Sequence, residues 1–230
     1  MNDLNTYHIY ALSERAAVIS LGNIIDETVN SKVLSMHAWL KEHSFPGLKD
    51  MVPAYSSLTV LYDPGTGFSH IKQLLERAWN AANEQAAVRP NIISIPVCYD
   101  PVFGYDLGPM AASKEMSVPE LVQLHCSKDY RVYMLGFLPG FAYMGTVDER
   151  LVMPRKPQPR EVEPGSVGIA GWQTGIYPLS SPGGWQIIGR TPLKLFDPKR
   201  EQPTLLNAGD TVRFYPITIN EFEQHGAYHH

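Results

Sequence analysis

This 230-residue chain is poor in cysteine, in charged residues and in long apolar runs. Its two cysteines, Cys98 and Cys126, have neither C-x-x-C spacing nor a histidine pair at zinc-finger distance, so a structural zinc site is not expected. The net charge of -4 argues against a nucleic-acid binder that works by bulk positive charge. No apolar run approaches the roughly 20 residues of a membrane span, and the N-terminus lacks the blocks of a signal peptide. We therefore expect a cytoplasmic globular protein that binds neither nucleic acid nor membranes.

Familiar catalytic motifs are also missing. The sequence contains no G-x-S-x-G elbow, no H-E-x-x-H and no EF-hand loop. The stretch Gly184–Thr191 spells G-x-x-x-x-G-R-T, close to a phosphate-binding P-loop, but Pro192 follows where a helix with free N–H groups should begin. His125 precedes Cys126, yet adjacent side chains rarely point at the same place. A self-contained serine hydrolase, cysteine hydrolase or P-loop ATPase is not predicted, and no metal site is predicted.

The periodicity of the apolar residues predicts an α+β protein with two domains. In the first part, strand patterns alternate with helical ones, and Asp26 is placed to cap a helix that runs to about His43. A second amphipathic helix is predicted over residues 68–83. Strands are predicted over residues 7–12, 16–21, 51–55 and 57–62. This order favours a small, ferredoxin-like α/β domain over residues 1–87, followed by a polar linker within residues 83–90.

The second part reads as a β-barrel domain over residues 91–220. Ser117 and Glu120 form a capping box with a proline in the first turn, which predicts one short helix, Val118–Cys126. Short apolar runs between glycines and prolines predict the strands. These runs cover residues 92–99, 130–135, 167–170, 176–179, 185–188, 193–196 and 211–215. Residues 221–230 are expected to be a tail.

Glycine is concentrated in one part of this second domain, where ten of the 18 glycines lie between Gly136 and Gly189. Glycine allows a ligand to approach the backbone and leaves N–H groups able to bind anions. Arginine adds a rigid fork of donors suited to carboxylate or phosphate. The candidate anion or substrate ligands are Arg155, Arg160 and Arg190, with the backbone of Gly183 and Gly184. Taken singly, each arginine could instead pair with a nearby glutamate.

Other candidates come from the same domain. Gln173, Tyr177 and Trp185 offer hydrogen bonds and an aromatic floor, although aromatic residues here fit a core equally well. His125 ends the predicted short helix and could carry a proton near neutral pH. Asp106 lies in a loop and is the second candidate for proton transfer, its alternative role being a turn residue.

These segments resemble the allophanate hydrolase subunit 1 family, which includes the B subunit of 5-oxoprolinase and the sporulation kinase inhibitor KipI. The resemblance covers about 110 residues and is most specific in the run from Pro-Gly-Gly-Trp to Gly-Arg-Thr-Pro. The matching segments are Tyr105–Leu107, Leu124–His125, Gly136–Phe141, Pro154–Arg155, Pro159–Arg160, Gly165–Val167, Ile176–Pro178, Ser181–Trp185, Gly189–Pro192 and Gly209–Asp210.

The resemblance implies a cyclophilin-like β-barrel as the C-terminal domain, without prolyl isomerase activity, because function does not follow from fold. It implies the B subunit of an ATP-dependent 5-oxoprolinase. That enzyme also contains a KipA-like C subunit, joined by an A subunit, and converts 5-oxoproline to glutamate. ATP, with Mg²⁺, would then bind in a site shared with a partner. The alternative is a KipI-like inhibitor that grips a sensor histidine kinase through a groove of Phe137, Phe141, Tyr143 and Trp185. A urea-amidolyase-like carboxyltransferase part is a third possibility that depends on partners outside this chain.

Overall fold

The computed structural model describes residues 6–84 and 90–227. The contacts divide the chain into two compact units, residues 1–89 and residues 90–230. Each unit buries its own cluster of apolar side chains. Each therefore has the separate hydrophobic core that is typical of a domain.

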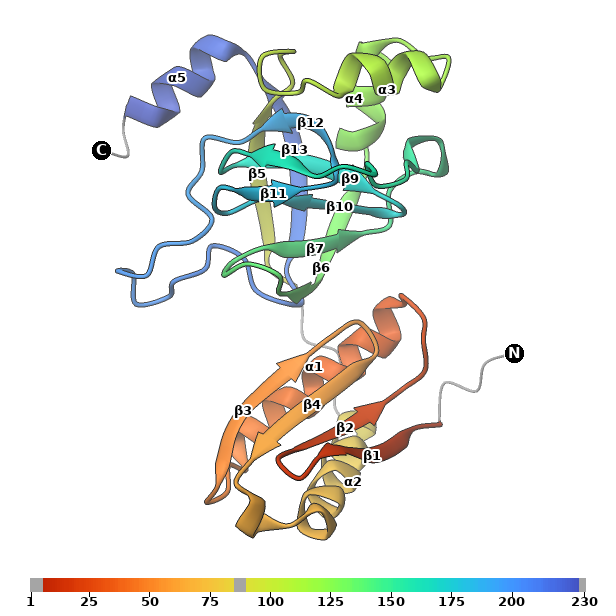
Figure 1. The fold of residues 1–230 in the computed structure, drawn as a ribbon, viewed down its shortest axis with the longest axis vertical. Coiled ribbons are helices and arrows are strands. Elements are labelled where there is room, and N and C mark those ends of the chain that lie inside the picture. The colour runs from red at the N-terminus through yellow and green to blue at the C-terminus, as the bar shows by residue number, and fades with distance from the viewer. Residues whose placement is uncertain (1–5, 85–89, 228–230) are drawn as a thin grey trace. The chain divides into compact units, whose positions relative to one another are not determined.

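The N-terminal unit is a four-stranded antiparallel sheet with two helices on one face (Figure 1). Its strands are β1 (His8–Ser13), β2 (Ala16–Ser20), β3 (Leu48–Pro53) and β4 (Ser57–Tyr62), in the order β1-β2-β4-β3. Its helices are α1 (Glu27–Glu42) and α2 (Phe68–Glu84), and a 3₁₀ turn, η1 (Pro64–Thr66), precedes α2. Helix α1 begins where predicted, because the Asp26 side chain accepts the N–H groups of Thr28 and Val29.

The topology of this unit differs in one respect from the ferredoxin-like arrangement. A ferredoxin-like unit runs β-α-β-β-α-β, whereas here both β1 and β2 precede α1. All neighbouring strands are antiparallel, and apolar side chains of both helices, among them Val33 and Leu75, pack in one core with the sheet. An antiparallel α/β sheet is what the structure has, and the ferredoxin-like name stays a prediction.

The C-terminal unit contains a closed barrel of seven strands, which is consistent with the predicted cyclophilin-like barrel. The order around the barrel is β10-β7-β6-β13-β5-β12-β9. These strands are β5 (Ile92–Cys98), β6 (Asp129–Leu135), β7 (Ala142–Gly145), β9 (Ser166–Ala170), β10 (Gln173–Ile176), β12 (Gln186–Arg190) and β13 (Thr211–Ile217). The barrel closes through a parallel pairing of β5 with β13, from Ile92 opposite Thr211 to Cys98 opposite Ile217.

Within residues 90–227, three α-helices accompany the barrel, where one was predicted. Helix α4 has the predicted bounds, Val118–Cys126, and the Ser117 side chain caps it by accepting the N–H of Glu120. Helix α3 (Leu107–Ser113) was missed because Gly108 and Pro109 read as a turn. It lies beside α4 at one end of the barrel (Figure 1). A short 3₁₀ turn, η2 (Glu149–Leu151), follows β7.

The predicted tail is wrong in part, since residues 219–227 form helix α5 (Ile219–Ala227). Its first turn is capped by a reciprocal pair: Thr218 Oγ1 accepts the N–H of Glu221, and the Glu221 carboxylate accepts the N–H of Thr218. Phe222 anchors the helix on Phe103, with the two rings 4.3 Å apart. The remaining tail residues, 228–230, and residues 85–89 of the predicted linker lie outside the described part of the chain.

Two predicted strands are also corrected. Residues 176–179 were expected to form a strand, but β10 ends at Ile176 and Pro178 cannot donate to a ladder. Residues 193–196 contribute the buried Leu195 to the core, yet Phe196 forms only an isolated bridge with Thr204. No helix among residues 6–84 and 90–227 is long and apolar enough to cross a membrane.

A small second sheet outside the barrel brings the motif-rich loops together. It pairs β8 (Arg160–Val162) with β11 (Ser181–Gly183), and its register places Arg160 opposite Gly183. The loop before β8 and the turn after β11 are therefore neighbours, although they lie more than 20 residues apart in the chain.

Candidate functional site

Asp106 is the residue that joins three segments at this place. Its carboxylate forms an ion pair with Lys156, and both side chains are 15% exposed. The same carboxylate accepts the backbone N–H of Ile187 at 2.7 Å, and the Asp106 N–H donates to the Ile187 carbonyl at 3.0 Å. The Lys156 N–H in turn donates to the Gly184 carbonyl at 2.7 Å. Asp106 thus ties the start of α3 to β12 and to the loop before β8.

Arg155 lies next to Lys156 of this ion pair and above an aromatic cluster. Its guanidinium carbon is 5.9 Å from the centre of the Trp185 ring, a distance suited to a cation–π contact. Burial raises the pKa of Tyr177 to about 12, a hydrogen bond with the Trp185 backbone acts the other way, and so does the charge of Arg155. Burial also raises the pKa of Tyr143, again against the charge of Arg155. Both tyrosines therefore stay protonated near neutral pH, and Arg155 is the cation beside them.

Arg160 opens β8 at the outer side of the same region and is exposed. Burial raises the pKa of Tyr105, the Asp106 charge adds to this rise, and Arg160 opposes it. Tyr105 is 40% exposed, and its ring centre lies 4.9 Å from the Lys156 ammonium. Arg155, Lys156 and Arg160 therefore converge with partly exposed tyrosines on one surface.

We call this surface the basic–aromatic face. It consists of Tyr105, Asp106, Tyr143, Arg155, Lys156 and Arg160, and the buried Trp185 lies beneath Arg155. Guanidinium groups bind phosphate or carboxylate oxygens, and partly exposed aromatic rings offer a flat apolar floor beside them. The face can therefore hold an anionic ligand by its charge and pack against its planar part.

Arg190 does not belong to this face. It ends β12, and its Nε donates to the Pro164 carbonyl at 2.8 Å. Its guanidinium carbon is 5.8 Å from the centre of the Phe103 ring, and its nearest acid is Glu163 at 3.9 Å. Because Arg190 and Trp185 lie at opposite ends of the β12 segment, the three predicted arginines divide into one pair and one separate residue.

Packing requires a glycine at position 183 and leaves more room at position 184. A methyl group on Gly183 would meet the Tyr177 hydroxyl at 2.5 Å and the Val162 side chain at 2.8 Å. On Gly184, it would lie 3.3 Å from the Lys156 carbonyl. Since residues 186–190 are strand β12 rather than a loop, the P-loop reading is rejected, as the sequence predicted.

His125 is placed inside the barrel and away from any ligand. Its side chain is fully buried, and it hydrogen-bonds to the Tyr99 hydroxyl at 2.8 Å and to Thr174 Oγ1 at 3.0 Å. Burial lowers the pKa of His125 to about 3. A group that is neutral and sealed from solvent cannot exchange protons with a substrate, so a structural role fits the geometry better than the predicted proton transfer.

The other three predicted residues, Gln173, Tyr177 and Trp185, do not all lie together. Gln173 begins β10 opposite Gly145 and Ala170, at the end of the strand away from Tyr177. Tyr177 and Trp185 are buried parts of the aromatic cluster with Phe141. Lys156 and Tyr105 were not predicted, although their positions beside Arg155 and Asp106 were a usable signal.

No group of three or more His, Cys, Asp or Glu side chains within residues 6–84 and 90–227 could hold a metal ion. Both cysteines are free thiols.

The family is decided by comparison with known proteins. A family model described as "Carboxyltransferase domain, subdomain C and D" matches residues 7–206. This chain belongs to that carboxyltransferase family. The resemblance inferred from the motifs is confirmed by relatives that are named as the B subunit of 5-oxoprolinase. The Bacillus subtilis (strain 168) protein is 42% identical and aligns over 94% of this chain and 95% of its own length. The Escherichia coli O157:H7 protein is 40% identical over 90% and 94%, respectively.

Solved structures agree with this assignment. TTHA0988 is 39% identical, with a TM-score of 0.79, over 88% of this chain and 40% of the TTHA0988 chain. The Kluyveromyces lactis urea carboxylase is 20% identical, with a TM-score of 0.71, over 95% of this chain and 22% of its own chain. The first relative shares sequence and fold, whereas the second shows a likeness of fold alone.

Proposed function

We propose that this chain is the B subunit of an ATP-dependent 5-oxoprolinase and acts with partner subunits to convert 5-oxoproline to glutamate. The observation that carries the proposal is the end-to-end match to the Bacillus subtilis protein of that name, at 42% identity over 94% of this chain and 95% of the relative. The match spans both structural units, so it does not reflect a single shared domain.

The chemistry explains why ATP is needed. A lactam is a stable amide, and transfer of the ATP γ-phosphoryl group to its carbonyl oxygen releases ADP and leaves an activated carbon. One water adds to that carbon, the ring C–N bond breaks, and the ring nitrogen takes a proton to become the amino group. A second water releases phosphate from the resulting acyl phosphate, which leaves glutamate. These steps depend more on groups that stabilise the negative charge of the phosphates than on a nucleophilic side chain.

The basic–aromatic face is suited to the phosphate part of this reaction. Arg155 and Arg160 supply donors on an open surface, and the Asp106–Lys156 ion pair positions the loop that carries Arg155. Asp106 is engaged by Lys156 and the Ile187 N–H, and His125 is sealed in the core. The general base is therefore assigned to one of the partner subunits, which makes this face one part of a divided site.

The proposed partners are the KipA-like C subunit of the enzyme and its A subunit. The longer TTHA0988 chain, of which this chain covers 40%, supports a requirement for additional polypeptide. Mg²⁺ accompanies ATP in most phosphoryl transfers and is held largely by phosphates and water. It is assigned no ligand here, in keeping with the lack of a metal-binding cluster among the described residues. Because the proposed reaction requires ATP, the proposed compartment is the cytoplasm.

The test is copurification and turnover. Coexpressed with its partner subunits, the chain should copurify with the KipA-like partner, and the complex should release glutamate and ADP from 5-oxoproline and ATP. The isolated chain should show no turnover. Full activity of the isolated chain would contradict the divided site, and an inactive complex of all subunits would contradict the 5-oxoprolinase assignment.

The role of the basic–aromatic face is tested in the same assay. Arg155→Gln and Arg160→Gln should each raise the KM for ATP by about tenfold, because charge-assisted hydrogen bonds to phosphate are lost. Arg150→Gln is the matched control, since Arg150 forms an exposed pair with Asp148. An equal KM for ATP in all three variants would place the nucleotide elsewhere.

The alternative, inhibition of a sensor histidine kinase, has less support. Of the four aromatic residues expected to line its groove, Phe141 and Trp185 are buried, at 1% and 4% exposure. Phe137 is 62% exposed and Tyr143 half-buried. A pull-down with such a kinase, followed by a phosphorylation assay, tests this role.

A further inference from the structure

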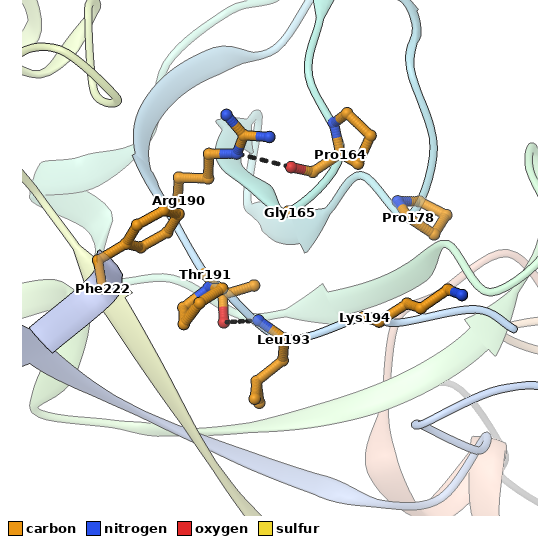
Figure 2. A pocket seen from close by; sticks show the side chains of 9 residues that line it. Pro164, Gly165, Pro178, Arg190, Thr191, Leu193, Lys194 and Phe222 are labelled. Carbon is orange, nitrogen blue, oxygen red and sulfur yellow. Dashed lines mark hydrogen bonds between the residues drawn. The ribbon is translucent and has the colours of Figure 1, made fainter. Parts of the chain in front are cut away.

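A second candidate site surrounds Arg190. The described residues there line an open pocket of about 240 Å³, with Pro164, Pro178 and Leu193 among its apolar walls. Phe222 of α5 lines another side (Figure 2). The pocket combines apolar walls with a cation at its rim, which is the usual composition of a small-molecule site.

The backbone donors of this pocket are largely used within the protein. The Gly165 N–H donates to the Tyr177 carbonyl, the Thr191 N–H to the Gly165 carbonyl, and the Leu193 N–H to Thr191 Oγ1. Its prolines have no N–H group. The polar contribution that remains for a ligand therefore comes from side chains.

Arg190 is the side chain with donors to spare. Its Nε is used by the Pro164 carbonyl, as the dashed line in Figure 2 shows. Within the described residues its terminal nitrogens make no hydrogen bond, and Glu163, 3.9 Å away, is 66% exposed. Lys194 also lines the pocket, but its ammonium is held by Asp197 at 3.0 Å. A ligand carboxylate can therefore pair with the guanidinium in a two-bond fork.

The pocket is also preorganised. Gly165 has φ +84°, and a methyl group there would lie 2.3 Å from the Thr191 carbonyl. Only glycine fits this position, which brings the loop before β9 directly against the end of β12. The adjacent Pro164 and Pro192 restrict the backbone on both sides. The walls are thus held in place before a ligand binds.

We propose that this pocket is the subsite for the small cyclic carboxylate substrate. Arg190 holds the carboxylate, and the lactam ring packs against the prolines and Leu193. The inference rests on the proposed function and deepens it. A volume of about 240 Å³ is below the roughly 300 Å³ at which drug-sized ligand pockets begin, so it suits a ligand as small as 5-oxoproline.

Binding to the full-length isolated chain tests this without relying on turnover. Titration with 5-oxoproline, followed by NMR, should shift resonances of Gly165, Thr191 and Leu193. 2-Pyrrolidinone, which has the ring without the carboxylate, and acetate, which has the carboxylate without the ring, should each bind at least about tenfold more weakly. Binding of acetate as tight as that of 5-oxoproline would reveal an unspecific anion site and overturn the assignment.

Two substitutions should act in opposite directions. Arg190→Gln should weaken 5-oxoproline binding at least about tenfold, whereas Glu163→Gln should tighten it, because a competing carboxylate is removed. Arg200→Gln, at an exposed arginine paired with Asp197, is the control. In the reconstituted complex, Arg190→Gln should raise the KM for 5-oxoproline and leave the KM for ATP unchanged.

The outcomes separate the two proposals. Equal binding by wild type, Arg190→Gln and Glu163→Gln, or an unchanged KM for 5-oxoproline in an active complex, overturns the pocket assignment and leaves the enzyme assignment standing. Charge-dependent binding in the pocket together with an inactive complex upholds the pocket and overturns the 5-oxoprolinase assignment.

Discussion

Acidification is the perturbation that tests the buried histidine of the barrel. His125 is completely buried, and its ring stacks on those of Tyr130 and Phe214. The Thr174 hydroxyl donates its proton to the Gly168 carbonyl at 3.1 Å, so Thr174 Oγ1 accepts from His125 Nε2–H. The other ring nitrogen, Nδ1, then accepts the Tyr99 hydroxyl proton at 2.8 Å. This network satisfies a neutral imidazole, and a second ring proton would point at a hydroxyl that already donates.

The magnitude follows from the pKa. Burial lowers the pKa of His125 from 6.5 to about 3, whereas the unfolded chain binds the proton near pH 6.5. The stability contributed by the neutral histidine is therefore fully present above about pH 6.5 and is lost as the pH falls toward 3. The loss is about 1.4 kcal/mol per pH unit, and on the order of 5 kcal/mol in total.

Urea unfolding between about pH 7.5 and about pH 4.5 measures this effect. Carboxylates also titrate over part of that range, so the informative quantity is the difference in slope between wild type and His125→Gln. The glutamine variant should be less stable at neutral pH, yet its free energy of unfolding should fall less steeply below about pH 6. His225→Gln, on α5 of the same unit, should keep the wild-type slope. Parallel slopes for wild type and His125→Gln would refute the reasoning.

Three further predictions concern packing. Asp106→Asn should lower the free energy of unfolding by about 1–3 kcal/mol, since the largely buried Lys156 ammonium loses its carboxylate partner. Urea unfolding measures this change, and an unchanged midpoint would contradict the role given to the Asp106–Lys156 ion pair. Gly183→Ala should cost about 1–3 kcal/mol, because the new methyl would lie 2.5 Å from a tyrosine hydroxyl. Gly184→Ala, at 3.3 Å from its nearest neighbour, should cost less than about 1 kcal/mol, and the reverse order of melting temperatures would count against this packing. Phe222→Ala should speed hydrogen exchange in residues 219–225 with little change in barrel stability; unchanged exchange would show that other contacts hold α5.

Much of the local structure was predictable because its causes are local. The capping residues Asp26 and Ser117 mark the starts of α1 and α4, since each side chain accepts backbone N–H groups within the next three residues. Glycines and prolines divide the second half of the chain into short strands. The family motifs likewise lie in continuous stretches of sequence. All of these signals act over a few residues, which is why the sequence alone determined helices α1, α2 and α4, most strands and the family.

The composition of the site was decided by the tertiary structure. Alternation of apolar residues shows which side of a strand faces the core, but not which strand lies beside it. Closure of the barrel separates Arg190 from Arg155 and Arg160, three residues that look alike in sequence. It also joins Asp106 to Lys156 across 50 residues and seals His125 inside. Long-range pairing therefore determines which of the predicted side chains share a surface.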